Sequence, residues 1–570
     1  MAQQGSAPVT TAYLVVGAGT AGCVMASRLS ENPTNHVILI EAGKDFANSK
    51  VPADIAASYA GRALYNPGYF WPALKVRRHA AAPAVRYEQA RVVGGGSSVN
   101  GQVALRGAPA DFDRWEALGA SGWNWASVSP YFRRLETDLD FEDEHHGRTG
   151  PIQISRFPSE LWDGFTTAVV AGWATEGYQQ RPDMNGVFGE GYAAVPLAND
   201  RSARSSSATG YLTDEVRNRP NLSILTETHV ERIVMDGRKA TGVVARRAGQ
   251  SETIRADRIV VCAGSLHSPW LLMKSGIGPA AHLKHHGIAP VVDLAGVGQN
   301  LQDHPTISAV AYIAPSRRRA VVRHNFANLV YSSGLAGAPS GDMVMSIICK
   351  TAWHALGDRM GALSTYIGKP YSIGEVRLGD ASPDAPDVTF NWLADDRDMQ
   401  RAAQSFRLMV AMLRLPQVAP AVLEVFAAGF SPKVKKIGAL TAWNRMLTSF
   451  TGAAMDASSL LRRQIIKHVA SDGQTVDELL ADDSALIDYL RSSATGIWHP
   501  SGTCRMGNAN DAAAVVDAMG KVIGVDGLIV ADASIMPDIP TTNLNLPTTM
   551  IAERISDMLA GNVLPPDKDD

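Results

Sequence analysis

Three glycines close to the N-terminus have the spacing of a turn that binds phosphates. They are Gly17, Gly19 and Gly22, between an apolar run at 12–16 and a stretch at 23–29 whose apolar residues recur at helical spacing. The first glycine would allow a tight turn, the second would let a pyrophosphate approach the backbone, and the third would let the helix pack on the strand. Free N–H groups at the helix start favour phosphates. The pattern predicts dinucleotide binding, with a plain strand-to-helix turn as the alternative.

A carboxylate follows the next predicted strand. Residues 36–40 are an apolar run typical of a buried strand, and Glu41 comes 19 residues after Gly22. This is close to the spacing at which an acid accepts hydrogen bonds from the ribose hydroxyls, and its charge would repel a 2′-phosphate. The acid strengthens the dinucleotide interpretation.

A second block of small residues lies at 91–101. It reads Arg-Val-Val-Gly-Gly-Gly-Ser-Ser-Val-Asn-Gly, so a flexible backbone with many unhindered N–H donors has apolar neighbours. Such a backbone can lie against a flat or anionic ligand. A solvated linker is the alternative, and the apolar neighbours argue against it.

Length and composition exclude several classes of protein. The chain has 570 residues, a length that predicts two to four domains or one core with large insertions, and its 45% hydrophobic content is typical of a globular protein. A net charge of −3 offers no field for nucleic acid or an anionic membrane. The four scattered cysteines form no pattern of a disulfide framework or a metal site. Because the N-terminus resembles no secretory signal and the apolar run from Tyr13 is too short to span a bilayer, we expect a cytoplasmic protein without membrane insertion.

Further elements can be predicted along the chain. Strands are expected at 152–155, 222–225, 259–264 and 528–530, and helices from Ser268-Pro269 to Ser275, over 402–415, over 476–492 and at the C-terminal end to Leu559. The first and last parts of the chain would together build one cofactor domain.

The motifs together resemble those of the glucose-methanol-choline (GMC) oxidoreductases. Besides both glycine blocks and Glu41, the matching segments, in the order of the family, are 264–269, 275–278, 296–305, 498–507 and 543–547. The resemblance covers nearly the whole chain. The segments 69–72, 498–499 and 531–537 are most similar to the bacterial 5-hydroxymethylfurfural oxidase and aryl-alcohol oxidase branch of that family.

The resemblance implies an α/β fold (α+β overall), with a Rossmann-like FAD-binding domain and a substrate-binding domain on a mostly antiparallel sheet. Carried onto this chain, the FAD-binding domain would comprise 1–155, 205–305 and 495–570, and the substrate-binding domain would comprise 156–204 and 306–494.

The resemblance also implies which residues contact FAD. Gly17, Gly19, Gly22 and Glu41 would hold the adenosine and pyrophosphate, Val230 would touch the adenine, Gly94, Gly95, Ser98, Asn100 and Gly101 would line the flavin, and Asp532 and Asn545 would serve the ribityl and flavin end. The expected contacts also include Thr20, Ala21, Ala42, Arg91, Ala263, Gly264, Ala533 and Asn543. Relatives with covalent FAD carry a histidine where this chain has Val99, so we expect non-covalent FAD.

His499 and Asn543 match the two catalytic positions of the family. Oxidation of an alcohol removes a hydroxyl proton and a hydride from the same carbon, and a flavin accepts only the hydride. His499 is the expected base because imidazole titrates near neutral pH, and the Asn543 amide would orient the alcohol. Phe70, Val99 and Trp498 are expected to line the substrate pocket, with core packing as the alternative for Phe70 and Trp498.

The expected reaction is oxidation of a primary alcohol, aromatic or heteroaromatic, with O2 reoxidising the flavin. The alternatives are a dehydrogenase of aliphatic, amino or polymeric alcohols that uses a quinone or another acceptor, and a hydroxynitrile lyase with structural FAD. Choline is less favoured because no acidic cluster for a quaternary ammonium is evident. The sequence predicts no oligomeric state.

Overall fold

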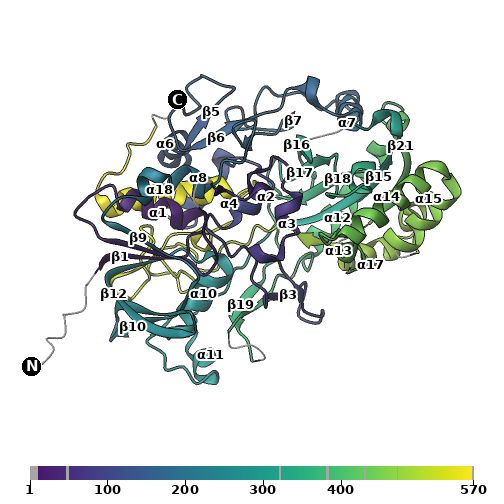
Figure 1. The fold of residues 1–570 in the computed structure, drawn as a ribbon. Helices are drawn as coiled ribbons and strands as arrows, with labels where there is room; N and C mark the ends of the chain where they lie inside the picture. Colours follow the sequence, from purple (N-terminus) through teal and green to yellow (C-terminus); the bar gives the residue numbers. More distant parts are fainter. Residues whose placement is uncertain are drawn as a thin grey trace, which may run out of the picture.

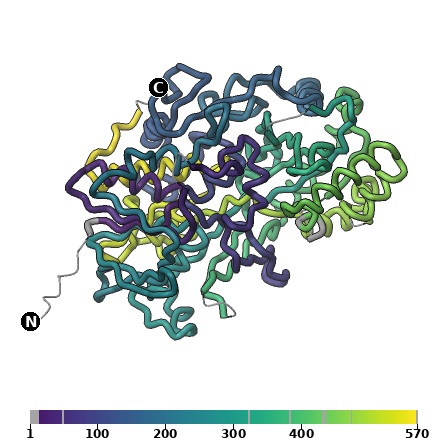
Figure 2. The backbone as a smooth tube through the Cα atoms, in the orientation of Figure 1, coloured from purple at the N-terminus to yellow at the C-terminus, as the bar shows by residue number. Residues whose placement is uncertain are grey.

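The computed structural model describes residues 11–46, 50–319, 323–380, 384–428, 432–471 and 473–567. Two large sheets lie on opposite sides of the view in Figure 1, and Figure 2 traces the chain between them. Both the early and the late parts of the chain contribute to the left-hand half. Within the described residues, no helix is long and apolar enough to cross a membrane.

The first sheet has parallel strands at its centre. Its order is β10-β11-β12-β1-β2-β9, and β23 pairs with β12. The parallel strands are β1 (Thr11–Val16), β2 (Val37–Ile40), β9 (Leu222–Leu225), β23 (Leu528–Val530) and the end of β12 (Gln250–Val261), and the antiparallel extension consists of β10 (Thr228–Asp236) and β11 (Lys239–Arg247). Parallel strands are covered on both faces, which explains why these segments are almost continuously apolar.

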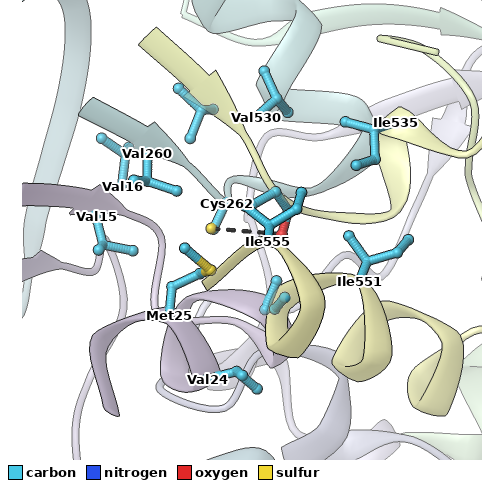
Figure 3. Close-up of a cluster of buried hydrophobic side chains, with 14 of the residues drawn as sticks. Val15, Val16, Val24, Met25, Val260, Cys262, Val530, Ile535, Ile551 and Ile555 are labelled. Atoms are coloured by element: carbon cyan, nitrogen blue, oxygen red, sulfur yellow. Dashed lines mark hydrogen bonds between the residues drawn. The ribbon is translucent and has the colours of Figure 1, made fainter. Parts of the chain in front are cut away.

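Helices α1 (Thr20–Leu29) and α18 (Asn545–Ala560) pack against this sheet. Figure 3 shows apolar side chains between them and the strands, among them Val15, Val260 and Ile551. The glycine turn and the last helix of the chain are therefore neighbours, and they place the residues at their first turns side by side.

The second sheet is antiparallel, with the order β21-β15-β18-β17-β16-β7, and β22 pairs with β15. The strands are β7 (Gly191–Ala194), β15 (Pro305–Ile313), β16 (Asn325–Tyr331), β17 (Met343–Ile348), β18 (Met360–Ile367), β21 (Val422–Ala427) and β22 (Thr495–Gly496). Helices α7 (Gly164–Thr175) and α12 (Asp396–Leu413) cover one face.

Smaller elements surround these two layers. Short sheets are formed by β3 (Lys75–Arg77), β4 (Val85–Arg86), β19 (Glu375–Leu378) and β20 (Pro386–Thr389), by β5 (Glu136–Asp138), β6 (Ile152–Ser155) and β8 (Leu197–Ala198), and by β13 (Ile277–Gly278) and β14 (Val292–Asp293). The other α-helices are α2 (Ala53–Ala56), α3 (Gly61–Leu64), α4 (Gly96–Val99), α5 (Pro109–Ala117), α6 (Trp125–Leu135), α8 (Ser207–Tyr211), α9 (Asp214–Arg217), α10 (Gly264–Lys274), α11 (Ala280–His285), α13 (Pro432–Gly438), α14 (Ala442–Ala457), α15 (Ser459–Ile465), α16 (Val476–Ala481) and α17 (Asp483–Ser493).

Two helices differ from the sequence prediction. Helix α10 begins at Gly264, so Pro269 lies inside it and not at its start. Proline cannot donate to the Ser265 carbonyl one turn earlier, and the Thr503 hydroxyl donates to that oxygen instead, at 2.6 Å. The predicted helix over 476–492 is two helices, because the Asp482 side chain caps the start of α17.

The predicted division into domains stays a prediction. The parallel strands come from the segments assigned to FAD, and β15 to β18 come almost entirely from those assigned to substrate. The small sheets cross this division, since β3 pairs with β20 and β6 pairs with β8. The first ten and last three residues of the predicted FAD-binding domain lie outside the described residues.

Candidate active site

A cavity of about 590 Å³ lies between the carboxyl ends of the parallel strands and the antiparallel sheet. The glycine turn and the residues after β2, β12 and β23 line one side, and side chains of β15 to β18 line the other. The predicted residues at its wall are Gly17, Gly19, Thr20, Ala21, Glu41, Ala42, Phe70, Gly95, Val99, Asn100, Gly101, Val230, Ala263, Gly264, Trp498, His499, Asp532, Ala533, Asn543 and Asn545. Ligands of open α/β sheets bind at this edge.

Four predicted contacts lie behind the cavity wall. A Cβ on Gly22 would come within 1.8 Å of the Gly17 carbonyl oxygen, so Gly22 serves helix packing. The Arg91 guanidinium donates to the Ala42 carbonyl at 3.0 Å. Gly94 donates to the backbone at 2.7 Å, and the Ser98 hydroxyl donates to the Val93 carbonyl at 2.8 Å. These four residues support the loops that form the wall, and their direct contact with FAD stays a prediction.

The remaining glycines leave room for a bulky anionic group. A Cβ added to Gly96 would have no described atom within 4 Å, and one added to Gly19 would approach only the Gly95 Cα, at 3.9 Å. Helices α1 and α18 both begin at the cavity, and neither receives a side-chain cap from any described residue. Their first-turn N–H groups are free to bind phosphate oxygens, so this part of the cavity fits the pyrophosphate of FAD.

Glu41 lies at the end of β2 with its carboxylate at the cavity. It accepts hydrogen bonds from the Ala18 and Gly43 backbone N–H groups, both at 2.8 Å. Burial raises the pKa of Glu41 to about 7, although these hydrogen bonds oppose that shift. The two N–H groups fix the carboxylate where the predicted ribose would bind.

The loop after β23 links the helices that begin at the cavity. The Asp532 carboxylate accepts from the Gly264 N–H at 2.8 Å and from the Ser268 hydroxyl at 2.6 Å, which holds the start of α10. The Thr20 hydroxyl donates to the Asn545 side chain at 3.1 Å, which joins the starts of α1 and α18.

His499 and Asn543 are in direct contact at the cavity. The Asn543 Nδ2 atom lies 3.1 Å from His499 Nε2, and both residues line the cavity wall. The backbone N–H of His499 donates to Asp303 Oδ1 at 2.9 Å. The structure thus brings together the two residues that the sequence singled out for chemistry.

A second histidine, His304, determines which nitrogen of His499 carries hydrogen. The two Nδ1 atoms are 2.8 Å apart, and His304 Nε2 lies 3.1 Å and 3.0 Å from the Gly368 and Pro540 carbonyl oxygens. An oxygen acceptor requires N–H, so His304 Nε2 is the donor and its Nδ1 is the acceptor. His499 therefore donates from Nδ1, and its Nε2 lone pair faces Asn543.

Both rings are neutral. Burial lowers the pKa of His499 to about 3 and holds the pKa of His304 well below its usual range, where the nearby His499 and Lys369 also disfavour charge. The Nε2 atom of His499 therefore carries no proton near neutral pH, and its lone pair accepts a hydrogen bond from the Asn543 amide.

The three residues predicted for the substrate pocket all reach the cavity. Phe70 and Val99 are 4% and 6% exposed, line the cavity and also belong to the main apolar core, and their contact with substrate stays a prediction. Trp498 has a φ of +60°, a rare conformation for a large side chain, immediately before His499. Such strain is concentrated at functional sites.

His304 had no predicted role, although it lies in the segment 296–305 that resembles the family. The polar side chains of β15 to β18 at the cavity wall were not predicted either. The Asp303-His304 pair directly before β15 was the available sign of a functional residue. The alternation of polar and apolar residues along the strands can be assigned to two faces only once the pairing of the strands is known.

Comparisons with known proteins place the chain in a family. The GMC oxidoreductase model matches residues 11–306 with its N-terminal part and 370–552 with its C-terminal part. The chain belongs to the GMC oxidoreductase family. It is 39% identical to 5-(hydroxymethyl)furfural oxidase of Methylovorus sp. (strain MP688), over 96% of this chain and 98% of that protein.

Other GMC proteins match over similar lengths. The oxygen-dependent choline dehydrogenase of Sinorhizobium fredii is 33% identical, over 96% of this chain and 95% of that protein. The crystal structure of pyridoxine 4-oxidase from Mesorbium loti superposes with a TM-score of 0.80 at 25% identity and covers 97% of this chain and 99% of that one. The family confirms the predicted fold class, FAD as the cofactor and the class of enzyme, an FAD-dependent alcohol oxidoreductase.

Proposed function

We propose that the chain oxidises primary alcohols on aromatic or heteroaromatic rings to aldehydes, with O2 as the electron acceptor. The observation that carries the chemistry is the contact of His499 Nε2 with Asn543 at the wall of a cavity that fits FAD. The ring preference is supported by Phe70, Trp498 and Tyr366 at the wall and by the 5-(hydroxymethyl)furfural oxidase relative. The same relative is named an oxidase, which supports O2 as the electron acceptor.

FAD, when bound, supplies the acceptor for the hydride. The Nε2 lone pair of His499 takes the hydroxyl proton, and the Asn543 amide holds the alcohol oxygen beside it. Because His304 accepts the Nδ1 hydrogen, the imidazole keeps one orientation before and after it takes the proton. The Asp303 carboxylate fixes the backbone of His499.

Choline is less favoured as a substrate. Among the described residues at the cavity wall, carboxylates are confined to Glu41, Glu88 and Asp532. Glu41 and Asp532 already accept backbone N–H groups, and no strand of the antiparallel sheet contributes an acid to the wall. A quaternary ammonium bound against that sheet would find no counter-charge on its strands.

Anaerobic mixing of the purified flavoprotein with furfuryl, benzylic, aliphatic and amino alcohols tests the function. We expect aryl alcohols to bleach the flavin and air to restore its colour. Bleaching that persists in air would indicate a dehydrogenase with another acceptor. Failure of every alcohol to bleach the flavin would favour the lyase.

The FAD is expected to be non-covalent, because Val99 at the cavity wall offers no nucleophilic nitrogen. Acid precipitation should release all flavin into the supernatant, and a yellow pellet would contradict this. The cytoplasmic location and the absence of a nucleic-acid partner stay predictions.

A further inference from the structure

The antiparallel sheet presents a polar patch to the cavity. On β17, Met343, Met345 and Ile347 face the apolar core beneath α7 and α12, whereas Ser346 lies on the other face and lines the cavity. The same alternation places Ser364 of β18 at the cavity and Leu363 in the core. Small polar side chains thus occupy positions that would have to be apolar if another layer of helices or strands packed on this face.

These residues form a row across four strands. Ser308 of β15 pairs in register with Ser364 of β18, Ser364 pairs with Ser346 of β17, and Ser346 pairs with Asn328 of β16. Neighbouring strands lie about 4.8 Å apart, so the row spans about 14 Å of the cavity wall. We call Ser308, Ser364, Ser346 and Asn328 the polar row.

Several side-chain polar atoms in and beside the polar row have no hydrogen-bond partner among the described residues. The Ser308 hydroxyl donates to the Ser364 hydroxyl at 3.0 Å, but the Ser346 hydroxyl bonds to no described residue. Asn325 Oδ1 and the Tyr366 hydroxyl also lack a partner among the described residues, although these side chains are only 3% and 4% exposed and line the cavity. Buried polar atoms without a partner are rare, so these atoms point to a ligand.

The polar row lies on the same sheet as Tyr366, whose ring is close to that of His499. The rings of Tyr366 and His499 are 6.4 Å apart, and Ser364 lies on the same face of β18 as Tyr366, about 6.6 Å away along the strand. An alcohol whose reacting hydroxyl lies beside His499 would therefore direct its opposite end toward the row.

Near the row, the cavity wall carries no uncompensated charge among its described side chains. Lys350, the cation at this part of the wall, pairs with Asp358 at 2.8 Å, so its charge is already compensated. Serine hydroxyls and an asparagine amide both donate and accept hydrogen bonds, as hydroxyl and carbonyl ligands require.

We propose that the polar row, with Asn325 and Tyr366, binds an uncharged oxygen function, a hydroxyl or a carbonyl, at the end of the substrate opposite the reacting hydroxymethyl group. This rests on the proposed function and narrows its substrates to ring alcohols with a second oxygen group. Ser346 is its most direct test, since its removal leaves no protein atom without a partner.

The experiment compares 5-hydroxymethylfurfural with 5-methylfurfuryl alcohol, in which a methyl group replaces the carbonyl. For Ser346→Ala we expect KM for 5-hydroxymethylfurfural to rise about 3- to 10-fold with kcat unchanged, and KM for 5-methylfurfuryl alcohol to stay the same. Because the KM change from wild type to variant is compared between the two substrates, the difference in their intrinsic reactivity cancels. Thr365→Val is the matched control, because Thr365 lies beside Ser364 on the same strand but faces the core.

Equal KM changes for both substrates, or none for either, would overturn the proposal, as would an equal shift in Thr365→Val. A preference of the wild type for 5-hydroxymethyl-2-furoate, which carries a carboxylate at that end, would also contradict it. If neither alcohol bleached the flavin of the wild type, the proposed function would fail and not merely the assignment of the polar row.

Discussion

His304 and His499 face each other through their Nδ1 atoms, 2.8 Å apart. Two nitrogen atoms at this distance share one hydrogen, and the carbonyl oxygens at His304 Nε2 leave that hydrogen on His499. His304 is thus a positioning residue. It is not among the residues that line the cavity, but it keeps the reactive lone pair of His499 on Nε2.

Replacing His304 should impair turnover through His499. In His304→Phe, the Nδ1 hydrogen of His499 loses its acceptor, and the other tautomer places a hydrogen on Nε2. We expect kcat to fall about 10- to 100-fold, with FAD still bound. Stopped-flow reduction of the flavin by an aryl alcohol would measure this.

His304→Gln supplies the control, since its side-chain oxygen can still accept that hydrogen. We expect it to recover part of the lost rate. An equal loss in both variants, with equal melting temperatures, would show that His304 matters only for packing.

Gly19 and Gly22 should respond differently to added side chains. Gly19 has a φ of −73°, and its Cβ would extend into the cavity, so Gly19→Val should fold but bind FAD at least about tenfold more weakly. Flavin absorbance after gel filtration and titration of the apoprotein with FAD would measure this.

Gly22→Ala is the contrasting variant, because its Cβ would collide with the Gly17 carbonyl. It should lower the melting temperature of the apoprotein, which Gly19→Val should not. A Gly19→Val protein with full FAD affinity would remove the glycine turn from the cofactor site.

The sequence predicted the strand, the glycine turn and the position of Glu41 at the cavity because their determinants are local. The turn from Gly17 to Gly22, the strand before it and Glu41 lie within 30 residues, where spacing specifies geometry. The start of α10 was missed because Thr503, far along the chain, replaces the donor that Pro269 lacks. The polar row escaped prediction for a similar reason: its members come from four strands whose register is set by tertiary pairing.

A buried charged cluster beside the cofactor half should make stability pH-dependent. It consists of three cations and three carboxylates, Arg106, His146, Arg156, Glu136, Asp138 and Asp183. Burial alone would lower the pKa of His146, but its carboxylate neighbours raise it to about 10. The formal charges of these six side chains sum to zero when His146 is protonated.

Because the folded pKa of His146 exceeds its unfolded value of about 6.5, this stabilisation is complete below pH 6.5 and is lost as the pH rises through 10. His146→Gln should lower the free energy of unfolding by about 3 kcal/mol at pH 6 and by less at pH 10. Denaturant unfolding at both pH values tests this, and a difference independent of pH would contradict it.

The central claim is that His499 takes the hydroxyl proton, and single-turnover reduction of the flavin tests it most directly. Anaerobic mixing of 5-hydroxymethylfurfural with wild type and with His499→Ala, both loaded with FAD, should show a rate about 10²- to 10⁴-fold lower in the variant. The melting temperature and flavin content should be unchanged. A variant that reduces its flavin at the wild-type rate would remove His499 from the mechanism.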